Sequence, residues 1–271
     1  MPTKKLGQNF VHDANTVRRI VQLAGVQPGE VVLEVGPGLG SLTLGLLEAG
    51  AHVVAVEIDK RLAAELPATA ASFAPGTLLD VVRADALEVR ELPAAPLRLV
   101  ANLPYNVSVP VLLHLLEHFD SLVSGVVMVQ AEVGHRLAAP PGSKVYGAPS
   151  VKAAWYGSWR VVGQVSRQVF WPVPNVDSVL VGFERHEASV VDVGSDAGSE
   201  ALRTATFEVV DAAFNQRRKM LRQALSERLG GSSAAASAVL ERAGVNPELR
   251  GEQLALADFV RIAQARAAVE Q

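Results

Sequence analysis

One stretch of the chain could hold a planar amine in place: Asn102-Leu103-Pro104-Tyr105, which follows the apolar run from Leu97 to Ala101. The side-chain oxygen of Asn102 and the carbonyl of Leu103 could each accept one N–H of an exocyclic amine, which would aim the nitrogen lone pair at an electrophile. Pro104 would stiffen the turn, and Tyr105 would offer a ring for stacking. Such a site needs no strong base, because orientation and charge placement lower most of the barrier. The alternative is an ordinary surface turn, which uses the same residue types.

A second signature comes earlier in the chain: Glu34-Val35-Gly36-Pro37-Gly38-Leu39-Gly40. Glycines at a strand end let backbone N–H groups, here those of Gly36 and Gly38, approach a ligand closely. Their spacing is not the Gly-x-Gly-x-x-Gly of dinucleotide sites, which disfavours an NAD-dependent oxidoreductase. Glu57 and Asp85 follow two later apolar runs and could accept from ribose hydroxyls and an adenine amine, although they could also be solvated strand ends. Together the two signatures predict transfer of a methyl group from S-adenosylmethionine to the amino nitrogen of a base.

The elements that must position these residues alternate between strand and helix from about Glu30 to Glu184. Short apolar runs predict buried parallel strands at 31–35, 53–56, 78–82, 97–101 and 126–130. Helical patterns lie between them at 42–49, 60–66 and 109–118, the second of which we expect to end before Pro67. Repeated strand–helix units predict an α/β fold with a doubly wound, Rossmann-like parallel sheet.

The C-terminal part of the sequence lacks the alternation of strands and helices. The segment Glu187 to Glu200 is rich in Ser, Asp, Gly and Val and predicts a linker or surface connection. From Glu200 onward the pattern is helical, with breaks at Gly230-Gly231-Ser232 and Asn246-Pro247, so we expect about four helices. We therefore predict a methyltransferase domain at residues 1–187, with an N-terminal extension, and a smaller all-helical domain at residues 188–271.

Composition narrows the function classes. The chain has 271 residues, a formal net charge of -3 and no cysteine, so disulfides and thiolate metal sites are excluded and RNA binding would need local basic patches. Its six histidines are scattered without metal-ligand spacing, so no metal is expected. No apolar run approaches the ~20 residues of a membrane span, and we expect a cytoplasmic protein with no membrane partner.

Along nearly its whole length the chain resembles the KsgA-type rRNA adenine N6-dimethyltransferases. Ordered motifs carry this resemblance: Gly7-Gln8-Asn9-Phe10, Glu34 to Thr43, Asn102 to Ser108, Gln130 to Val133, Phe170 to Ser178 and Phe214 to Lys219. Several motifs in the family's order are more specific than any one of them. Ala131 and Gly134 depart from the family's usual lysine and alanine, which puts RNA contacts there in doubt more than methyl transfer.

The resemblance implies roles for individual residues. Asn9, Val11, Gly36 and Gly38 would contact S-adenosylmethionine. Glu57 would hold its ribose, Asp85 its adenine, and Asn102 would face both the cofactor and the target amine. Tyr105 and Phe170 would sandwich the target base, beside Leu103 and Pro104.

The resemblance also implies a substrate. Leu103 and Asn106 favour the housekeeping small-subunit enzyme over relatives that methylate large-subunit rRNA. Two adjacent adenines near the 3′ end of 16S rRNA, in immature small ribosomal subunits, would each be dimethylated by a monomer. A binding module that acts mainly as an assembly checkpoint is the competing class, and the intact catalytic turn with both acids favours the enzyme.

A basic cluster near the C-terminus is a candidate RNA contact. On a helix starting near Phe207, Arg218 would lie within an apolar stripe and Arg217 at its edge, toward the junction between domains. Phosphate contact and structural ion pairing are both open for the cluster, which consists of Arg217, Arg218, Lys219 and Arg222. We expect this cluster and a second patch to flank one cleft, the second patch being Lys4, Lys5, Arg18 and Arg19.

Overall fold

A computed structural model describes residues 9–187 and 196–270. The chain forms two compact units, the first made of Met1–His135 and Ser158–Arg185, and the second of Arg136–Gly157 and His186–Gln271. The expected boundary after residue 187 lies next to the last of these changes. However, the segment Arg136–Gly157, which we expected in the first domain, belongs to the second unit, because Tyr146 and Val151 are buried in the helical core.

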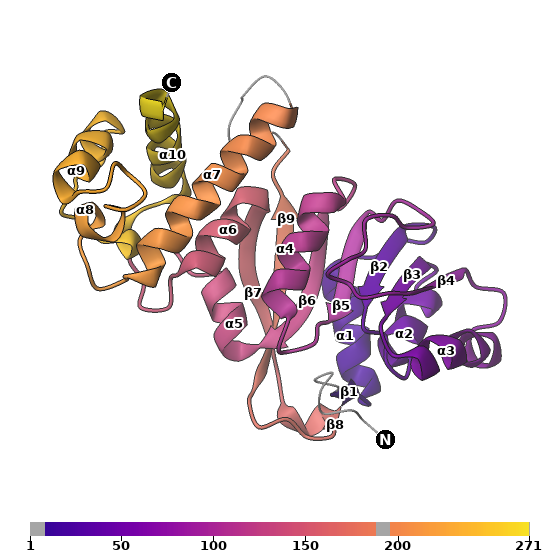
Figure 1. The fold of residues 1–271 in the computed structure, drawn as a ribbon. Coiled ribbons are helices and arrows are strands. Elements are labelled where there is room, and N and C mark those ends of the chain that lie inside the picture. The colour runs from indigo at the N-terminus through magenta and orange to yellow at the C-terminus, as the bar shows by residue number, and fades with distance from the viewer. Residues whose placement is uncertain (1–8, 188–195, 271) are drawn as a thin grey trace. The chain divides into compact units, whose positions relative to one another are not determined.

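The first unit is built on a seven-stranded sheet with the order β4-β3-β2-β5-β6-β9-β7 (Figure 1). Five strands run parallel: β2 (Val31–Val35), β3 (His52–Glu57), β4 (Leu79–Arg83), β5 (Arg98–Asn102) and β6 (Ser124–Gln130). They confirm the predicted Rossmann-like α/β class. The sheet continues through β9 (Ser178–Arg185), which is antiparallel to β6, and β7 (Gly157–Val165).

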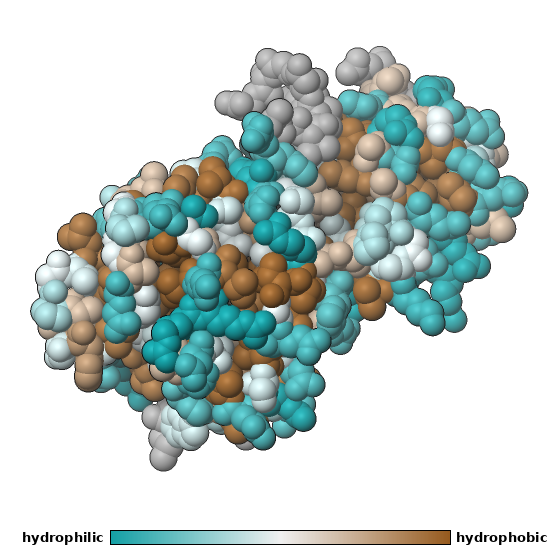
Figure 2. Space-filling view, turned by 180° about the vertical axis from the view of Figure 1, so that it is seen from behind, coloured by the Kyte–Doolittle hydropathy of each residue, from teal (hydrophilic) through white to brown (hydrophobic). Residues whose placement is uncertain are grey.

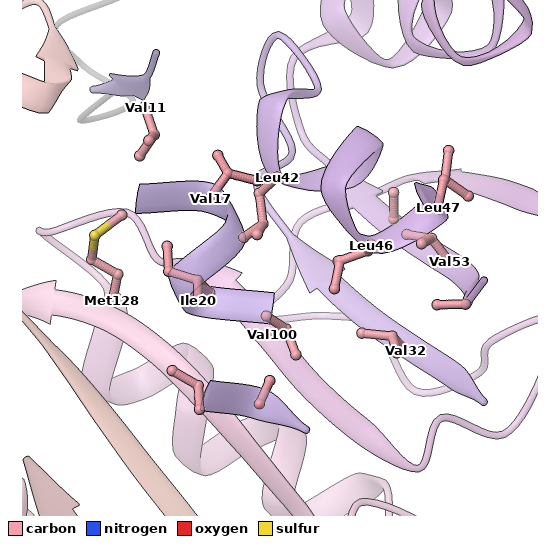
Figure 3. Packing of buried hydrophobic residues seen from close by; sticks show 14 of the residues in the cluster. Val11, Val17, Ile20, Val32, Leu42, Leu46, Leu47, Val53, Val100 and Met128 are labelled. Atoms are coloured by element: carbon pink, nitrogen blue, oxygen red, sulfur yellow. The ribbon is translucent and has the colours of Figure 1, made fainter. Parts of the chain in front are cut away.

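Helices cover both faces of this sheet. Alternate strand residues divide between the faces: Val32 packs in the cluster that contains α1 (Ala14–Ala24) and α2 (Ser41–Glu48), whereas Leu33 is buried outside that cluster. Figure 3 shows this cluster, in which helix side chains meet strand side chains; its labelled members include Val17, Ile20, Leu42, Leu46, Val53 and Val100. The other helices of this unit are α3 (Lys60–Phe73), α4 (Ser108–His118) and α5 (Ala131–Leu137), whose end crosses into the second unit, together with a 3-10 turn, η2 (Arg167–Val169).

The expectation that a helix ends before Pro67 is wrong. Helix α3 (Lys60–Phe73) runs through Pro67 and beyond. Pro67 removes one backbone hydrogen bond at a cost of about 3 kcal/mol. Ala63, Leu66 and Ala70, at helical spacing on both sides of the proline, are all buried. Their burial against the core offsets that cost, so packing overrides the local signal.

A separate two-stranded ribbon joins distant parts of the sequence. Strand β1 (Phe10–Val11) pairs antiparallel with β8 (Phe170–Trp171), so that Phe10 lies opposite Trp171 and Val11 opposite Phe170. The backbone N–H of His12 extends the pairing by donating to the carbonyl of Val169 at 2.9 Å. The ribbon brings the N-terminal motif and the late Phe-x-Pro motif together.

The second unit is helical in its described residues. It contains α6 (Ala148–Tyr156), α7 (Asp196–Asn215), α8 (Leu221–Ala224), α9 (Ser233–Arg242), the 3-10 turn η3 (Gly251–Gln253) and α10 (Leu256–Glu270). The expected breaks fall before α9 and between α9 and α10. Of the expected linker 187–200, residues 188–195 lie outside the described ranges, and Asp196 already begins α7.

Across the described ranges, no helix has the length and apolar character that crossing a membrane would require. Hydrophilic side chains are spread between hydrophobic patches over the face shown in Figure 2.

Candidate active site

A cavity of about 270 Å³ lies in the first unit, where the carboxyl ends of β2, β3 and β5 meet the loop after β4. Ligands in open α/β sheets bind at this edge. The structure brings to it every residue for which a cofactor role was predicted; these are Asn9, Val11, Gly36, Gly38, Glu57, Asp85 and Asn102. Leu103, Pro104 and Tyr105 line the same cavity, so the cofactor loop and the catalytic turn share one space.

The glycine loop after β2 needs its glycines. Gly36, Gly38 and Gly40 have φ values of 69°, 60° and 89°, in the left-handed region that other residues rarely adopt. A Cβ on Gly38 would also lie 2.7 Å from the ring of Phe10. The ring of Phe10 thus packs directly on the loop, and a side chain at Gly38 would displace it.

Glu57 is the last residue of β3, and its side chain contacts the glycine loop. Its Oε2 accepts from the backbone N–H of Gly38 at 3.1 Å, and its Oε1 accepts from that of Asp59 at 2.8 Å. The side chain is buried, and this burial raises the pKa of its carboxyl, against the effect of the two N–H donors. A carboxylate has about four lone-pair sites, so Glu57 can still accept from ribose hydroxyls.

Asp85 lies in the loop after β4 and lines the same cavity. It is half-buried, and its Oδ1 accepts from the backbone N–H of Leu87 at 2.9 Å. Within the described ranges, its Oδ2 accepts no hydrogen bond. One oxygen therefore fixes the side chain while the other can accept from an amine.

Glu34 also lines the cavity, and sequence reasoning assigned it no role. It is 1% exposed, and the hydroxyl of Thr43 donates to its Oε2 at 2.6 Å. Burial raises the pKa of Glu34 to about 8; the bond from Thr43 opposes this rise, and the charge of Glu57 adds to it. The signal in the sequence was an acid inside an otherwise apolar strand, two residues before the first glycine.

Asn102 has one satisfied and one unsatisfied end. Its Nδ2 donates to the backbone carbonyl of Asn9 at 2.9 Å, which fixes the orientation of the amide. Its Oδ1 is buried and has no hydrogen-bond partner among the described residues. An unpaired buried acceptor costs about 1–3 kcal/mol, so this oxygen is poised for a donor on a ligand. The next residue, Leu103, is held by its own N–H, which donates to the carbonyl of Met128 at 3.1 Å.

Tyr105 and Phe170 are close, but they do not form two parallel faces. Their ring centroids are 6.5 Å apart, with an angle of 77° between the planes. The Tyr105 hydroxyl shares a 2.5 Å hydrogen bond with the hydroxyl of Ser178, and burial raises the Tyr105 pKa. Phe170 is buried in the core and is not among the residues that line the cavity. Stacking of one base between both rings requires one ring to turn.

Three residues of the basic cluster in the second unit, Arg217, Arg218 and Lys219, lie in the turn after α7, whereas Arg222 lies in the short helix α8. Helix α7 ends at Asn215, so the expectation that Arg218 lies within the apolar stripe of a helix starting near Phe207 is wrong. The break has a clear cause: the N–H groups of Leu221 and Arg222 donate to the carbonyls of Leu249 and Pro247 at 2.7 and 3.1 Å, instead of back along a helix.

The residues of this cluster have different environments. Arg217 pairs with Glu252 at 2.7 Å and donates to the carbonyl of Lys144 at 2.8 Å, and Arg222 pairs with Glu248 at 3.5 Å. Arg218 and Lys219 are exposed and form no ion pair with any described residue.

The other predicted patch is described in part. Lys4 and Lys5 lie outside the described residues. Arg18 is exposed and donates to Asn15 at 2.7 Å, while Arg19 donates to the carbonyl of Gln164 at 3.1 Å. Within residues 9–187 and 196–270, no group of three or more His, Asp or Glu side chains could hold a metal.

The chain is similar to known proteins over nearly its whole length. Residues 2–267 match the model of the family described as ribosomal RNA adenine dimethylase. The chain is 71% identical to ribosomal RNA small subunit methyltransferase A of Leifsonia xyli over 97% of this chain and 91% of the relative. It is 61% identical to the protein of the same name in Kineococcus radiotolerans, over 98% of this chain and 86% of the relative.

Solved structures share the fold. A dimethyladenosine transferase from Plasmodium falciparum aligns with a TM-score of 0.77 and 23% identity, over 93% of this chain and 95% of that one. The 23S rRNA methyltransferase ErmE aligns with a TM-score of 0.68 and 24% identity, over 96% and 100% of the two chains.

Proposed function

The chain belongs to the ribosomal RNA adenine dimethylase family, and from this premise we propose that it dimethylates the N6 amines of two adjacent adenines near the 3′ end of 16S rRNA. When bound, S-adenosylmethionine supplies each methyl group from its sulfonium. The residues of the cavity fit this cofactor. Backbone N–H groups of the glycine loop stand beside Glu57, an acceptor for ribose hydroxyls, and Asp85, an acceptor for an amine, lines the same space.

The observation that carries the proposal is the unpaired Oδ1 of Asn102 at the end of β5. An adenine amine is a weak nucleophile because its lone pair is delocalised into the ring. If Oδ1 accepts one N–H and the Leu103 carbonyl accepts the other, the nitrogen becomes more pyramidal, so its lone pair is less delocalised into the ring and can attack the methyl group. Asn9 holds the amide in that orientation through its backbone carbonyl. Catalysis is therefore mainly positioning.

No side chain of the catalytic turn need act as a strong base. Each methyl transfer leaves a positively charged nitrogen, so one of its N–H protons becomes acidic and can leave to water. Tyr105 is a poor base here, because burial raises its pKa and its hydroxyl is bound to Ser178. Its role is to face the ring of the base, which must first leave its own stack.

We propose immature small ribosomal subunits as the partner and the cytoplasm as the compartment, because the proposed substrate is 16S rRNA. We also propose that the protein works as a monomer. Exposed Arg218 and Lys219 support the RNA partner, since phosphate contacts need cations that are not already paired.

Mass spectrometry of rRNA from cells that lack the protein tests the proposal. Loss of both dimethyladenines near the 3′ end of 16S rRNA, restored by the wild-type gene and not by an Asn102→Ala gene, is the expected result. Intact methylation in the deletion strain would overturn it.

A further inference from the structure

An exposed aromatic ring lies at the rim of the cavity. Trp171 is 52% exposed, whereas its neighbour Phe170 in β8 is 1% exposed, because successive strand residues face opposite sides. The motif that begins at Phe170 has the pattern Phe-x-Pro-x-Pro, in which x is any residue. Trp171 is the first x, so the family resemblance gives it no role.

Phe10 connects this ring to the cavity. It lies opposite Trp171 in the ribbon, and the two rings are stacked with centroids 6.4 Å apart and planes 22° apart. Phe10 lines the cavity and packs on Gly38 of the cofactor loop. The indole is therefore one ring away from the cofactor loop. Trp171 is 52% exposed beside Phe10, so the indole keeps an exposed surface on which a second ring can stack.

Arg167 connects the two ends of the segment that contains Trp171. Arg167 pairs with Asp177 at 3.0 Å and donates to the carbonyl of Asn175 at 3.3 Å. Val173 in the same loop is 62% exposed, so this rim is apolar. An exposed apolar surface beside a substrate cavity offers a planar ligand a place to pack.

We propose that the exposed surface of Trp171 stacks the base next to the adenine that enters the cavity. This inference rests on the proposed function, because it assumes an RNA substrate with one base flipped into the site. When one nucleotide turns into a pocket, its neighbour loses a stacking partner, and single-stranded RNA is commonly bound by stacking such splayed bases on aromatic side chains. An indole accepts any base, so Trp171 would position the strand without reading its sequence.

A nucleobase fits this rim better than a membrane surface does. Interfacial anchors combine apolar side chains with unpaired Lys or Arg. Here the arginine of the loop, Arg167, is already paired with Asp177. Stacking needs an exposed ring and no net charge, which is what Trp171 provides.

The test measures binding of a deproteinised 3′ fragment of 16S rRNA that contains the adenine pair. A second fragment carries an abasic sugar at the position next to the pair, prepared separately on the 5′ and the 3′ side. Four proteins are compared: wild type, Trp171→Ala, Trp171→Phe, which keeps a ring, and Phe73→Ala, which removes an exposed ring at the end of α3, outside the cavity lining.

Trp171→Ala should weaken binding of the intact fragment by about 5- to 150-fold, whereas Trp171→Phe should restore most of it and Phe73→Ala should bind like wild type. One of the abasic fragments should bind the wild type more weakly by a similar factor, with no further loss for Trp171→Ala. KM for the RNA should rise in Trp171→Ala while kcat at saturating RNA stays the same.

Two results would overturn the inference: wild-type affinity in Trp171→Ala, or equal losses from Trp171→Ala on intact and both abasic fragments. Loss of binding to vesicles of phosphatidylserine and phosphatidylcholine in Trp171→Ala, with RNA affinity unchanged, would assign the ring to a membrane instead. Binding needs no turnover, so a wild type that binds the fragment with this pattern but transfers no methyl would refute the proposed function and leave the stacking inference standing.

Discussion

Glu57 accepts a hydrogen bond from the backbone N–H of Gly38 at 3.1 Å, so the acid expected to hold the cofactor ribose also holds the cofactor loop. The same carboxylate accepts from Asp59 on its other side. Loss of Glu57 therefore removes a ligand contact and loosens the loop that makes the remaining contacts.

Glu57→Ala should bind S-adenosylmethionine about ten- to a hundredfold more weakly, since losing a hydrogen bond to a charged group costs ~1.5–3 kcal/mol. Calorimetry gives the affinity, and the melting temperature reports on the loop. Glu57→Gln keeps one acceptor oxygen and should lose less. A folded Glu57→Ala variant with wild-type affinity would exclude Glu57 from the site.

Asn102→Ala should lower the rate of methyl transfer by about a hundredfold or more while RNA affinity changes little, because Oδ1 acts on the reacting nitrogen. Single-turnover rates at saturating cofactor and RNA measure this effect. Asn102→Asp keeps an acceptor but loses the Nδ2 donor to Asn9, so it separates the acceptor from its anchor. A near wild-type rate in Asn102→Ala would contradict the mechanism.

Stability should fall as pH rises because of Glu34. The folded pKa is about 8 and the ordinary value is 4.5, so between these values the folded state holds a proton that the unfolded state has released. The destabilisation therefore grows from about pH 4.5 to pH 8 and is constant above it, with a total on the order of a few kcal/mol. Glu34→Gln should flatten this pH dependence in urea unfolding. An unchanged slope in the variant would mean that Glu34 is ionised when folded.

Arg218 and Lys219 should contact phosphates, and Arg217 should stabilise the second unit. Changing Arg218 and Lys219 together to Ala should reduce the salt slope of binding to immature small subunits by roughly 1.4–1.8, which is about 0.7–0.9 for each contact. Arg217→Ala, the matched control, should lower the melting temperature with a smaller change in slope, since it breaks the pair with Glu252. Cofactor affinity should stay the same in both. The original salt slope in the double variant would refute the phosphate contacts.

Local sequence patterns predicted correctly those elements whose structure depends on neighbouring residues of the chain alone. The run 31–35 and the turn after residue 101 needed no long-range information, because apolar strands and glycine turns are local signals. Two other features depend on distant parts of the chain. The helix continues through Pro67 because Leu66 and Ala70 are buried. Helix α7 ends at Asn215, and the residues that follow bond to the carbonyls of Leu249 and Pro247.

The site shows the same division. That Glu57 and Asp85 share a cavity follows from parallel strands ending at one edge. The bond from Asn102 to Asn9 does not, because it joins residues 93 positions apart. Similarly, the assignment of Arg136–Gly157 to the second unit depends on which core buries Tyr146, and no local pattern encodes that choice.

The short ribbon of β1 and β8 gives the cavity walls of unequal strength. The floor belongs to a seven-stranded sheet, whereas the rim is a ladder of two residue pairs, anchored by Val11 and Phe170 in the core. Two-stranded ribbons are marginal on their own, and such segments open at free energies well below that of global unfolding. The rim can therefore fluctuate while the glycine loop and the catalytic turn keep their shape. In an enzyme that must discharge a spent cofactor after every methyl group, such a rim would act as a gate whose opening rate bounds turnover.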